Sequence, residues 1–310
     1  MDGSVARAAE RVGHGVIVRQ RFVKLDVTHV AVSLMPLRAG EARWGRGQET
    51  AGEDPYLTSQ YAVGYVSGMQ GDPAVGDGYL KTMVTCKHFF GFNLGTTLAY
   101  GGGFSQGQGF NALISDQDMA DSFLPAFRAC ITEAKGASVM CSYNAVSKPT
   151  ASPSFRLCTP LQVCLKSLCA LQVNGIPSCG NKWLLQDILR DEWGHEGHVV
   201  SDCGGVSDIE NPRYPKTRAC LAAQGVKLPS KMEETASECW CNATDCGGFP
   251  TVGPQATAAA GITSGTDLDC GSVYKDSMAS ALESGAVSQA ELDQSLQRLF
   301  LNRMRTGEFE

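Results

Sequence analysis

The chain has 310 residues, of which 43% are hydrophobic and 19% are charged, and its formal net charge is −6 at pH 7. This composition predicts a packed globular core in place of disorder, in one large α/β barrel or two ordinary domains. The mild acidity gives no electrostatic basis for binding nucleic acid or anionic membranes, and no apolar run reaches the roughly 18 residues that span a bilayer. We therefore expect neither a nucleic-acid nor a membrane partner. Neutral substrates such as sugars fit this charge balance, although it does not single them out.

The cysteine content indicates an oxidising compartment. The chain contains 13 cysteines, which is many for a cytosolic protein of this length. Its N-terminal segment, however, carries charge every few residues, as in Arg7, Glu10 and Arg11, and lacks the apolar stretch of a signal peptide. The two observations agree if the natural N-terminus precedes this sequence, and this is what we expect.

Short apolar runs alternate with helical patterns along the chain. The runs that predict buried strands are residues 29–35, 82–89, 137–143 and 198–201. The stretches that predict helices begin at the Asp54-Pro55 pair and end at Gly71, run from the capping residue Ser115 to 134, cover 182–193, and run from the capping pair Ser288 and Glu291 to Gly307. Strands that alternate with helices predict a parallel α/β architecture.

Two stretches interrupt this alternation and are predicted to be insertions. Residues 147–173 and 211–255 have neither helical nor strand periodicity. The cysteines outside them are Cys86, Cys130, Cys141, Cys179, Cys203 and Cys270. Inside the second stretch, three cysteines at 239, 241 and 246 lack the regular spacing and the nearby histidine of a zinc site, so disulfides or free thiols are expected there and no metal.

Polar side chains gather where the predicted strands end. Lys87 and His88 lie at the end of the second strand, Tyr143 at the end of the third, and Asp202 directly after the fourth. In a parallel barrel these strand ends converge on one face and form the active site. A carboxylate can attack an anomeric carbon, while basic and aromatic side chains hold the sugar. Residue by residue, a buried ion pair for the Lys-His pair and a turn or helix cap for the Asp stay open, so the residues alone predict an α/β enzyme with a polar pocket.

Seven motifs in consistent order resemble those of glycoside hydrolase family 3. They include Trp-Gly-Arg-Gly-Gln-Glu-Thr-Ala-Gly-Glu-Asp-Pro-Tyr at 44–56, Cys-Lys-His-Phe at 86–89 and Val-Val-Ser-Asp-Cys at 199–203, and the others lie at 139–144, 174–179, 265–271 and 298–309. The resemblance implies a (β/α)8 TIM-type barrel that is incomplete at its N-terminal end. It also implies secretion and a requirement for neither metal nor organic cofactor.

The resemblance implies roles for individual side chains. Asp202 matches the catalytic nucleophile, which forms a covalent glycosyl-enzyme. The residues that match the substrate-binding set are Arg46, Lys87, His88, Met140 and Tyr143.

The residue after the nucleophile bears on the substrate. β-Glucosidases of the family commonly have Trp there, whereas this chain has Cys203, together with Cys86 and Cys270. That pattern is similar to the β-xylosidase/α-L-arabinofuranosidase branch, and β-glucosidase is the alternative. The β-N-acetylglucosaminidase branch carries a Pro and a second His after Lys-His-Phe, which are absent here.

The chain also departs from the family pattern. Residues 1–42 are an unmatched segment, residues 43–310 are a partial catalytic barrel, and the second α/β domain, which carries the family's general acid/base, is expected to be absent. Joining Val146 to Asn174 restores a motif that residues 147–173 split, so this stretch is either retained intron sequence or a lineage-specific loop. The sequence predicts a retaining exo-β-glycosidase that acts on xylosides. The alternative from another class is a non-catalytic sugar-binding remnant, and the oligomeric state is not indicated.

Overall fold

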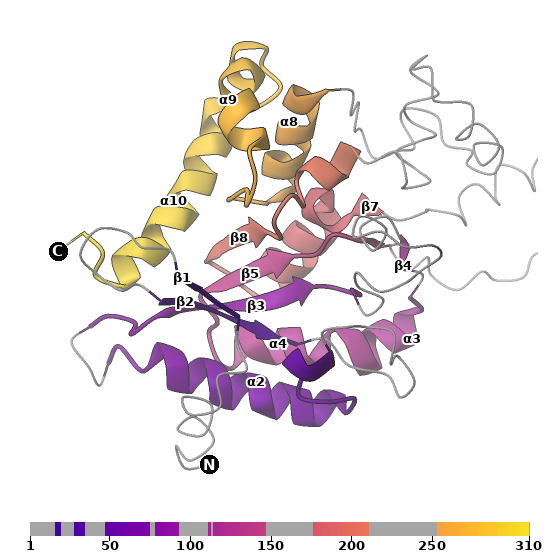
Figure 1. Cartoon of the computed structure of the whole chain (residues 1–310), viewed down its shortest axis with the longest axis vertical. Coiled ribbons are helices and arrows are strands. Elements are labelled where there is room, and N and C mark those ends of the chain that lie inside the picture. Colours follow the sequence, from indigo (N-terminus) through magenta and orange to yellow (C-terminus); the bar gives the residue numbers. More distant parts are fainter. Residues whose placement is uncertain are drawn as a thin grey trace, which may run out of the picture.

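A five-stranded sheet lies at the centre of the computed structural model, which describes residues 16–19, 28–34, 47–74, 78–92, 111–112, 114–146, 176–210 and 253–309 (Figure 1). Its strands, in spatial order, are β1 (Val16–Arg19), β2 (Thr28–Ser33), β3 (Met83–Phe89), β5 (Ser138–Cys141) and β8 (His198–Ser201). The strands predicted from apolar runs are all present, although the third is shorter than predicted because it leaves the sheet after Cys141.

Four of the five strands are parallel. β1 pairs with β2 in antiparallel fashion, and the pairs β2–β3, β3–β5 and β5–β8 are parallel. A single parallel bridge from Val200 to Leu268 extends the β8 edge. The α/β class predicted from the sequence is therefore confirmed. Within the described residues the sheet is open, with β1 and β8 at its edges, and closure into an eight-stranded barrel stays a prediction.

Helices lie on both sides of this sheet in Figure 1, with α2 and α4 below it and α8, α9 and α10 above. The helical elements are η1 (Gly47–Glu49), α2 (Pro55–Gln70), α3 (Asp116–Asp118), η2 (Met119–Phe123), α4 (Pro125–Thr132), η3 (Ser178–Gly180), η4 (Trp183–Glu192), η5 (Ser207–Glu210), α8 (Pro254–Ser264), α9 (Val273–Glu283) and α10 (Gln289–Arg305). A small second sheet joins β4 (Asn111–Ala112), β6 (Ala145–Val146) and β7 (Ile176–Pro177).

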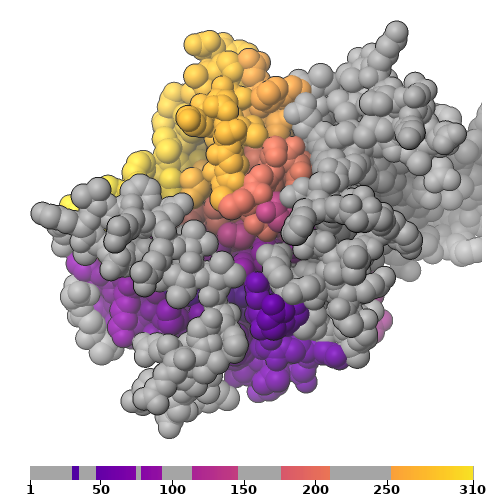
Figure 2. Space-filling model, viewed as in Figure 1, coloured from indigo at the N-terminus to yellow at the C-terminus, as the bar shows by residue number. Residues whose placement is uncertain are grey.

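The space-filling view in Figure 2 shows two regions of the described chain on the visible face. The helices α8 to α10 occupy one side of this face, and the purple residues from the N-terminal third of the chain occupy the other side.

The predicted helix ends are explained by local hydrogen bonds. Asp54 caps α2, since its Oδ1 accepts the N–H of Leu57 at 2.9 Å, and Gly71 ends the helix at a positive φ of 70°. Ser288 and Glu291 form the predicted capping box of α10.

The prediction of one continuous helix from Ser115 to 134 is wrong in its middle. Pro125 has no N–H to donate, and its ring would clash with the preceding turn of a continuous helix. The helix instead changes to a wider π-helical turn in η2, where the N–H of Leu124 donates to the oxygen of Met119 at 3.0 Å. A new helix, α4, then begins at Pro125.

Aromatic packing joins the sheet to α4 and to the end of η4. The Phe89 ring of β3 lies 5.1 Å from that of Phe127 in α4 and 5.8 Å from that of Trp193, measured between centroids. Leu184 and Leu189 of η4 are fully buried beside them. Each such buried side chain contributes roughly 1.5–3 kcal/mol relative to exposure, so this packing fixes β3 and β5 and the residues at their ends.

Candidate active site

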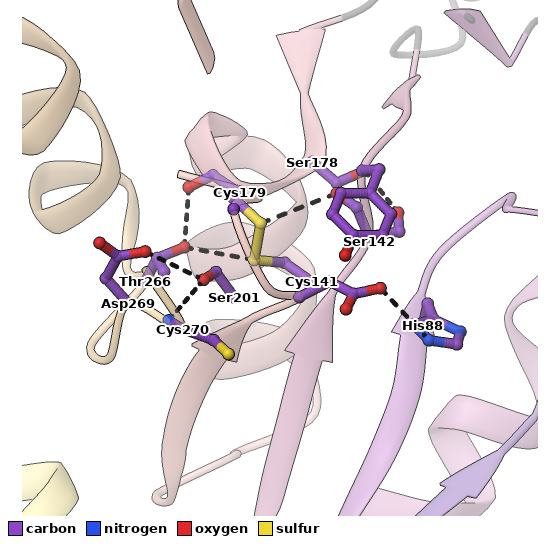
Figure 3. Close-up of a disulfide and its surroundings, with 12 residues drawn as sticks. His88, Cys141, Ser142, Ser178, Cys179, Ser201, Thr266, Asp269 and Cys270 are labelled. Atoms are coloured by element: carbon purple, nitrogen blue, oxygen red, sulfur yellow. Dashed lines mark hydrogen bonds and ion pairs between the residues drawn. A yellow bond between two sulfur atoms is a disulfide. The ribbon is translucent and has the colours of Figure 1, made fainter. Parts of the chain in front are cut away.

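The carboxyl ends of β3, β5 and β8 bring together most of the predicted site residues. Lys87 and His88 belong to β3, Met140 belongs to β5, and Asp202 directly follows β8. The N–H of Asp202 donates to the oxygen of Cys141 at 3.1 Å, which continues the β5–β8 pairing to the carboxylate-bearing residue. Figure 3 shows His88 and Cys141 on neighbouring strands of this edge. Because the strands are parallel, side chains far apart in sequence share one edge of the sheet.

The Asp202 carboxylate has a defined orientation. Its Oδ1 accepts the N–H of Cys203 at 2.8 Å, and its Oδ2 lies 3.4 Å from Nε2 of His88. The Asp202 side chain is 12% exposed, so it is largely buried yet reachable, whereas the His88 side chain is 1% exposed. One oxygen of the carboxylate is held by a main-chain N–H and the other faces an imidazole, so the protein and not the solvent sets the orientation of this group.

Lys87 is buried against an acidic partner that the sequence interpretation did not assign. Its Nζ lies 3.1 Å from Oε2 of Glu49 in η1, and the two side chains are 6% and 17% exposed. An ammonium group removed from water in this way needs a counter-charge. Glu49 lies in the first of the seven motifs, and this position is the sequence signal from which it could have been predicted as a site residue.

Tyr143 approaches Asp202 through the main chain. Its hydroxyl donates to the carbonyl oxygen of Cys203 at 2.8 Å. The ring of Phe92 lies between Tyr143 and His88, at centroid distances of 5.6 Å and 5.4 Å. Phe92 is therefore a second site neighbour that was not predicted.

The remaining predicted residues are less closely tied to the carboxylate. Met140 is half-buried in β5, where it pairs in register with Val200 of β8. Arg46 lies outside the described residues, as do the predicted insertion at 147–173 and residues 211–252 of the second one.

Three disulfides connect the six cysteines that lie outside the predicted insertions. The bonds are Cys86–Cys130, Cys141–Cys179 and Cys203–Cys270. The second bond lies at the carboxyl end of β5, with Ser142, Ser178 and Thr266 around it (Figure 3). The third begins at the residue after Asp202.

A buried charge network holds the segment that packs along β8. The Asp267 side chain is fully buried, and it accepts bonds from Arg190 at 2.6 Å, Arg298 at 3.1 Å and Ser295 Oγ at 2.9 Å. It also accepts the N–H of Val199 in β8 at 2.8 Å. Burial lowers the pKa of Arg190, and the Asp267 charge opposes that effect. One carboxylate thus ties η4, β8 and α10 together.

Two further side chains pack at the N-terminal end of β8. Asn302 of α10 is fully buried, donates from Nδ2 to the oxygen of Ala137, and lies 2.9 Å from Nδ1 of His198. His195 is buried just before β8, and burial together with the Arg190 charge lowers its pKa from 6.5 to about 3. The imidazole of His195 therefore stays neutral across the physiological range.

Within the described part of the chain, no group of three or more His, Cys, Asp or Glu side chains is placed to hold a metal ion. No helix among those residues is long and apolar enough to cross a membrane.

The fold and the site define an α/β protein with a carboxylate site at the ends of parallel strands. The chain belongs to glycosyl hydrolase family 3: the family's N terminal domain model matches residues 15–228. The family resemblance identified from the motifs is thereby confirmed.

Curated relatives carry xylosidase names. The chain is 34% identical over 273 residues to a probable exo-1,4-beta-xylosidase of Aspergillus terreus, which covers 87% of this chain and 27% of the relative. It is 31% identical over 271 residues to a beta-xylosidase/alpha-L-arabinofuranosidase of Medicago sativa subsp. varia, with 87% and 26% covered. The chain therefore spans about a quarter of the length of these relatives.

Solved structures agree in fold. A family 3 exo-beta-xylosidase in complex with a xylobiose aziridine activity-based probe superposes with a TM-score of 0.60 at 28% identity, covering 89% of this chain and 27% of that one. A beta-glucosidase from Listeria innocua superposes with a TM-score of 0.58 at 23% identity, covering 89% and 28%, and supports the fold alone.

Proposed function

We propose that this chain is the nucleophile-bearing part of a retaining exo-β-glycosidase, with Asp202 as the nucleophile. One observation carries the proposal: Asp202 directly follows β8, with Oδ1 on the Cys203 N–H and Oδ2 3.4 Å from Nε2 of His88. In the proposed reaction the carboxylate attacks the anomeric carbon, the aglycone leaves, and water then releases the sugar with retention.

The neighbouring side chains have binding roles in this proposal. Lys87 and His88 hold hydroxyl groups of the sugar, Met140 and Tyr143 line the same subsite, and Arg46 contacts the same sugar. The Lys87–Glu49 pair supports this, because a lysine already paired keeps its donors directed while it binds a neutral substrate. No metal or organic cofactor takes part in the proposed chemistry.

The proposed substrate is a β-xyloside of xylan or of its oligosaccharides. Two observations support xylose: the cysteine after the nucleophile is bonded to Cys270, and the curated relatives carry xylosidase names. The same site in a β-glucosidase is the alternative within the family. The proposed compartment is extracellular, since three disulfides within the described residues require an oxidising environment to form.

Covalent trapping tests the reaction and the residue together. The full chain is incubated with a 2-fluoro-xyloside that carries an activated leaving group, so that the first step needs no general acid. We expect a mass increase of one fluoroxylosyl group on a peptide that contains Asp202, and no increase in the Asp202→Asn variant. A label on any other peptide would contradict the assignment, and faster labelling by the matched 2-fluoro-glucoside would favour the glucosidase alternative.

A second candidate function is sugar binding without turnover. Glu49 favours it, because this carboxyl group beside the site is already engaged in an ion pair with Lys87. Calorimetric binding of xylose without release of the aryl group from aryl xylosides, and without trapping by the activated fluoroside, is the outcome that supports this candidate.

A further inference from the structure

The segment at 267–270 is joined to the nucleophile strand by a strip of main-chain hydrogen bonds. The N–H of Asp267 donates to the oxygen of Val199 at 2.8 Å, that of Ser201 to the oxygen of Leu268 at 2.8 Å, and that of Gly204 to the oxygen of Cys270 at 2.7 Å. The N–H of Cys270 also donates to Ser201 Oγ at 3.0 Å. These bonds hold the segment along β8 as far as Gly204.

The Cys203–Cys270 disulfide closes this strip at the end nearest Asp202. Cys203 is then held at three points. Its N–H donates to Asp202 Oδ1 at 2.8 Å, its carbonyl oxygen accepts the hydroxyl of Tyr143 at 2.8 Å, and its side chain is bonded to Cys270. Such a residue cannot rotate its peptide away from the carboxylate without breaking one of these links.

We propose that the Cys203–Cys270 disulfide positions the Asp202 carboxylate, by holding the Cys203 N–H on Oδ1 so that Oδ2 faces His88 and the sugar. This inference rests on the proposed function of Asp202 and adds a positioning element to it. Cys203 is exposed, so an untethered peptide at this position exchanges its bond to Oδ1 for bonds to water, and the carboxylate loses its fixed orientation.

The same bond is the one that a reductant reaches most readily among the described disulfides. Cys86, Cys130, Cys141 and Cys179 are fully buried, whereas Cys203 is exposed and Cys270 half-buried. Thiol–disulfide exchange requires access of a thiolate to a sulfur atom. A small dithiol attacks one sulfur, then closes to a cyclic disulfide as the second thiolate leaves. The dithiol is thereby oxidised by two electrons, and Cys203 and Cys270 are left as two thiols.

The test measures labelling by the 2-fluoro-xyloside before and after mild treatment of the full chain with dithiothreitol. Alkylation and peptide mapping identify which of the 13 cysteines have been reduced. When Cys203 and Cys270 are reduced, we expect the labelling rate constant at saturating probe to fall about tenfold, the equivalent of one lost hydrogen bond of about 1.4 kcal/mol. The acid limb of its pH profile moves to higher pH, because the ionised carboxylate has lost a donor, and reoxidation restores both.

Two double variants separate positioning from general stability. Cys203→Ser with Cys270→Ser should reproduce the slow labelling and the displaced acid limb, with no further effect of dithiothreitol. Cys86→Ala with Cys130→Ala should lower the melting temperature and leave the pH profile of labelling unchanged. Equal labelling rates in the oxidised and reduced protein, or a dithiothreitol effect that persists in the Cys203→Ser/Cys270→Ser variant, would overturn the proposal.

Amide hydrogen exchange decides the question even where labelling fails. Absence of labelling in the oxidised protein would refute the proposed function, while exchange at Cys203 still reports the positioning bond. We expect the Cys203 amide to exchange about tenfold faster after reduction, whereas the Ser201 amide, bonded to Leu268 in the strip, should be unchanged. Equal exchange at Cys203 before and after reduction would refute the positioning role independently of activity.

Discussion

His88 Nε2 lies 3.4 Å from Oδ2 of Asp202, and the two residues stand at the ends of β3 and β8 with β5 between them. The imidazole is almost completely buried, so its position is set by the sheet and not by solvent. The relative position of this pair therefore depends on the register of three strands, and it can be changed without replacing Asp202.

Replacement of His88 by Asn should weaken sugar binding. The shorter side chain cannot keep the contact with Asp202 and also reach a sugar hydroxyl, and we expect the probe concentration for half-maximal labelling to rise about tenfold, the equivalent of one lost hydrogen bond to the sugar. Labelling kinetics over a range of 2-fluoro-xyloside concentrations measure it. His195→Gln, which changes a buried histidine away from the site, is the matched control, and equal effects of the two variants would contradict the prediction.

The Glu49–Lys87 pair predicts a large effect of removing one partner. Glu49→Gln leaves the Lys87 charge buried with no counter-charge, and we expect a loss of about 3 kcal/mol in the free energy of unfolding. Urea denaturation followed by circular dichroism checks it. The double variant Glu49→Gln/Lys87→Met should recover part of this loss, because no unpaired charge remains. A loss in the double variant equal to the sum of the losses in Glu49→Gln and in Lys87→Met would show that the two side chains do not interact.

Asp267→Asn should be more damaging to stability than any surface ion-pair variant. Arg190 and Arg298 both rely on this one buried carboxylate, and its neutralisation leaves two guanidinium groups without a counter-charge, at a cost of about 3–5 kcal/mol. The matched control is Glu196→Gln, which breaks a pair with Arg305 that is largely exposed and should change stability by less than about 1 kcal/mol. Urea midpoints that coincide for the two variants would exclude the network as a stabilising element.

His195 predicts a loss of stability in mild acid. Its pKa is about 3 in the folded chain and about 6.5 when unfolded, so below pH 6.5 protons bind the unfolded chain first and favour unfolding. Above pH 6.5 the group is neutral in both states and contributes no pH dependence. Between pH 7 and pH 5 we expect a loss of about 2 kcal/mol in the wild type that is absent in His195→Gln, measured by urea denaturation at each pH. Parallel pH profiles for the two proteins would show that another group is responsible.

Local features of the fold could be predicted from the sequence because they depend on neighbours along the chain. The Asp54 and Ser288 caps, the four parallel strands and the polar strand ends Lys87, His88 and Asp202 follow from short-range patterns. The break at Pro125 also had a local cause, and the helical periodicity on both sides of it concealed the missing N–H.

The long-range partners could not be predicted in the same way. Glu49 meets Lys87, and Asp267 meets Arg190 and Arg298, only because distant elements come together in the fold. Six cysteines allow 15 connectivities, so their pairing needed the structure as well. The motifs predicted Asp202 as the nucleophile, whereas the groups that hold this side chain in place come from contacts between segments.

The contacts around β8 are completed by residues that are synthesised after it. Asp202 leaves the ribosome well before Cys270, Arg298 and Asn302, the side chains that anchor its strand or the segment beside it. While α10 is still inside the exit tunnel, β8 has its pairing to β5 but not its buried contacts to that helix. The carboxylate that we propose as the nucleophile thus acquires its final surroundings only after α10 has been translated, and a pause in elongation before α10 would expose an unfinished strand edge to chaperones.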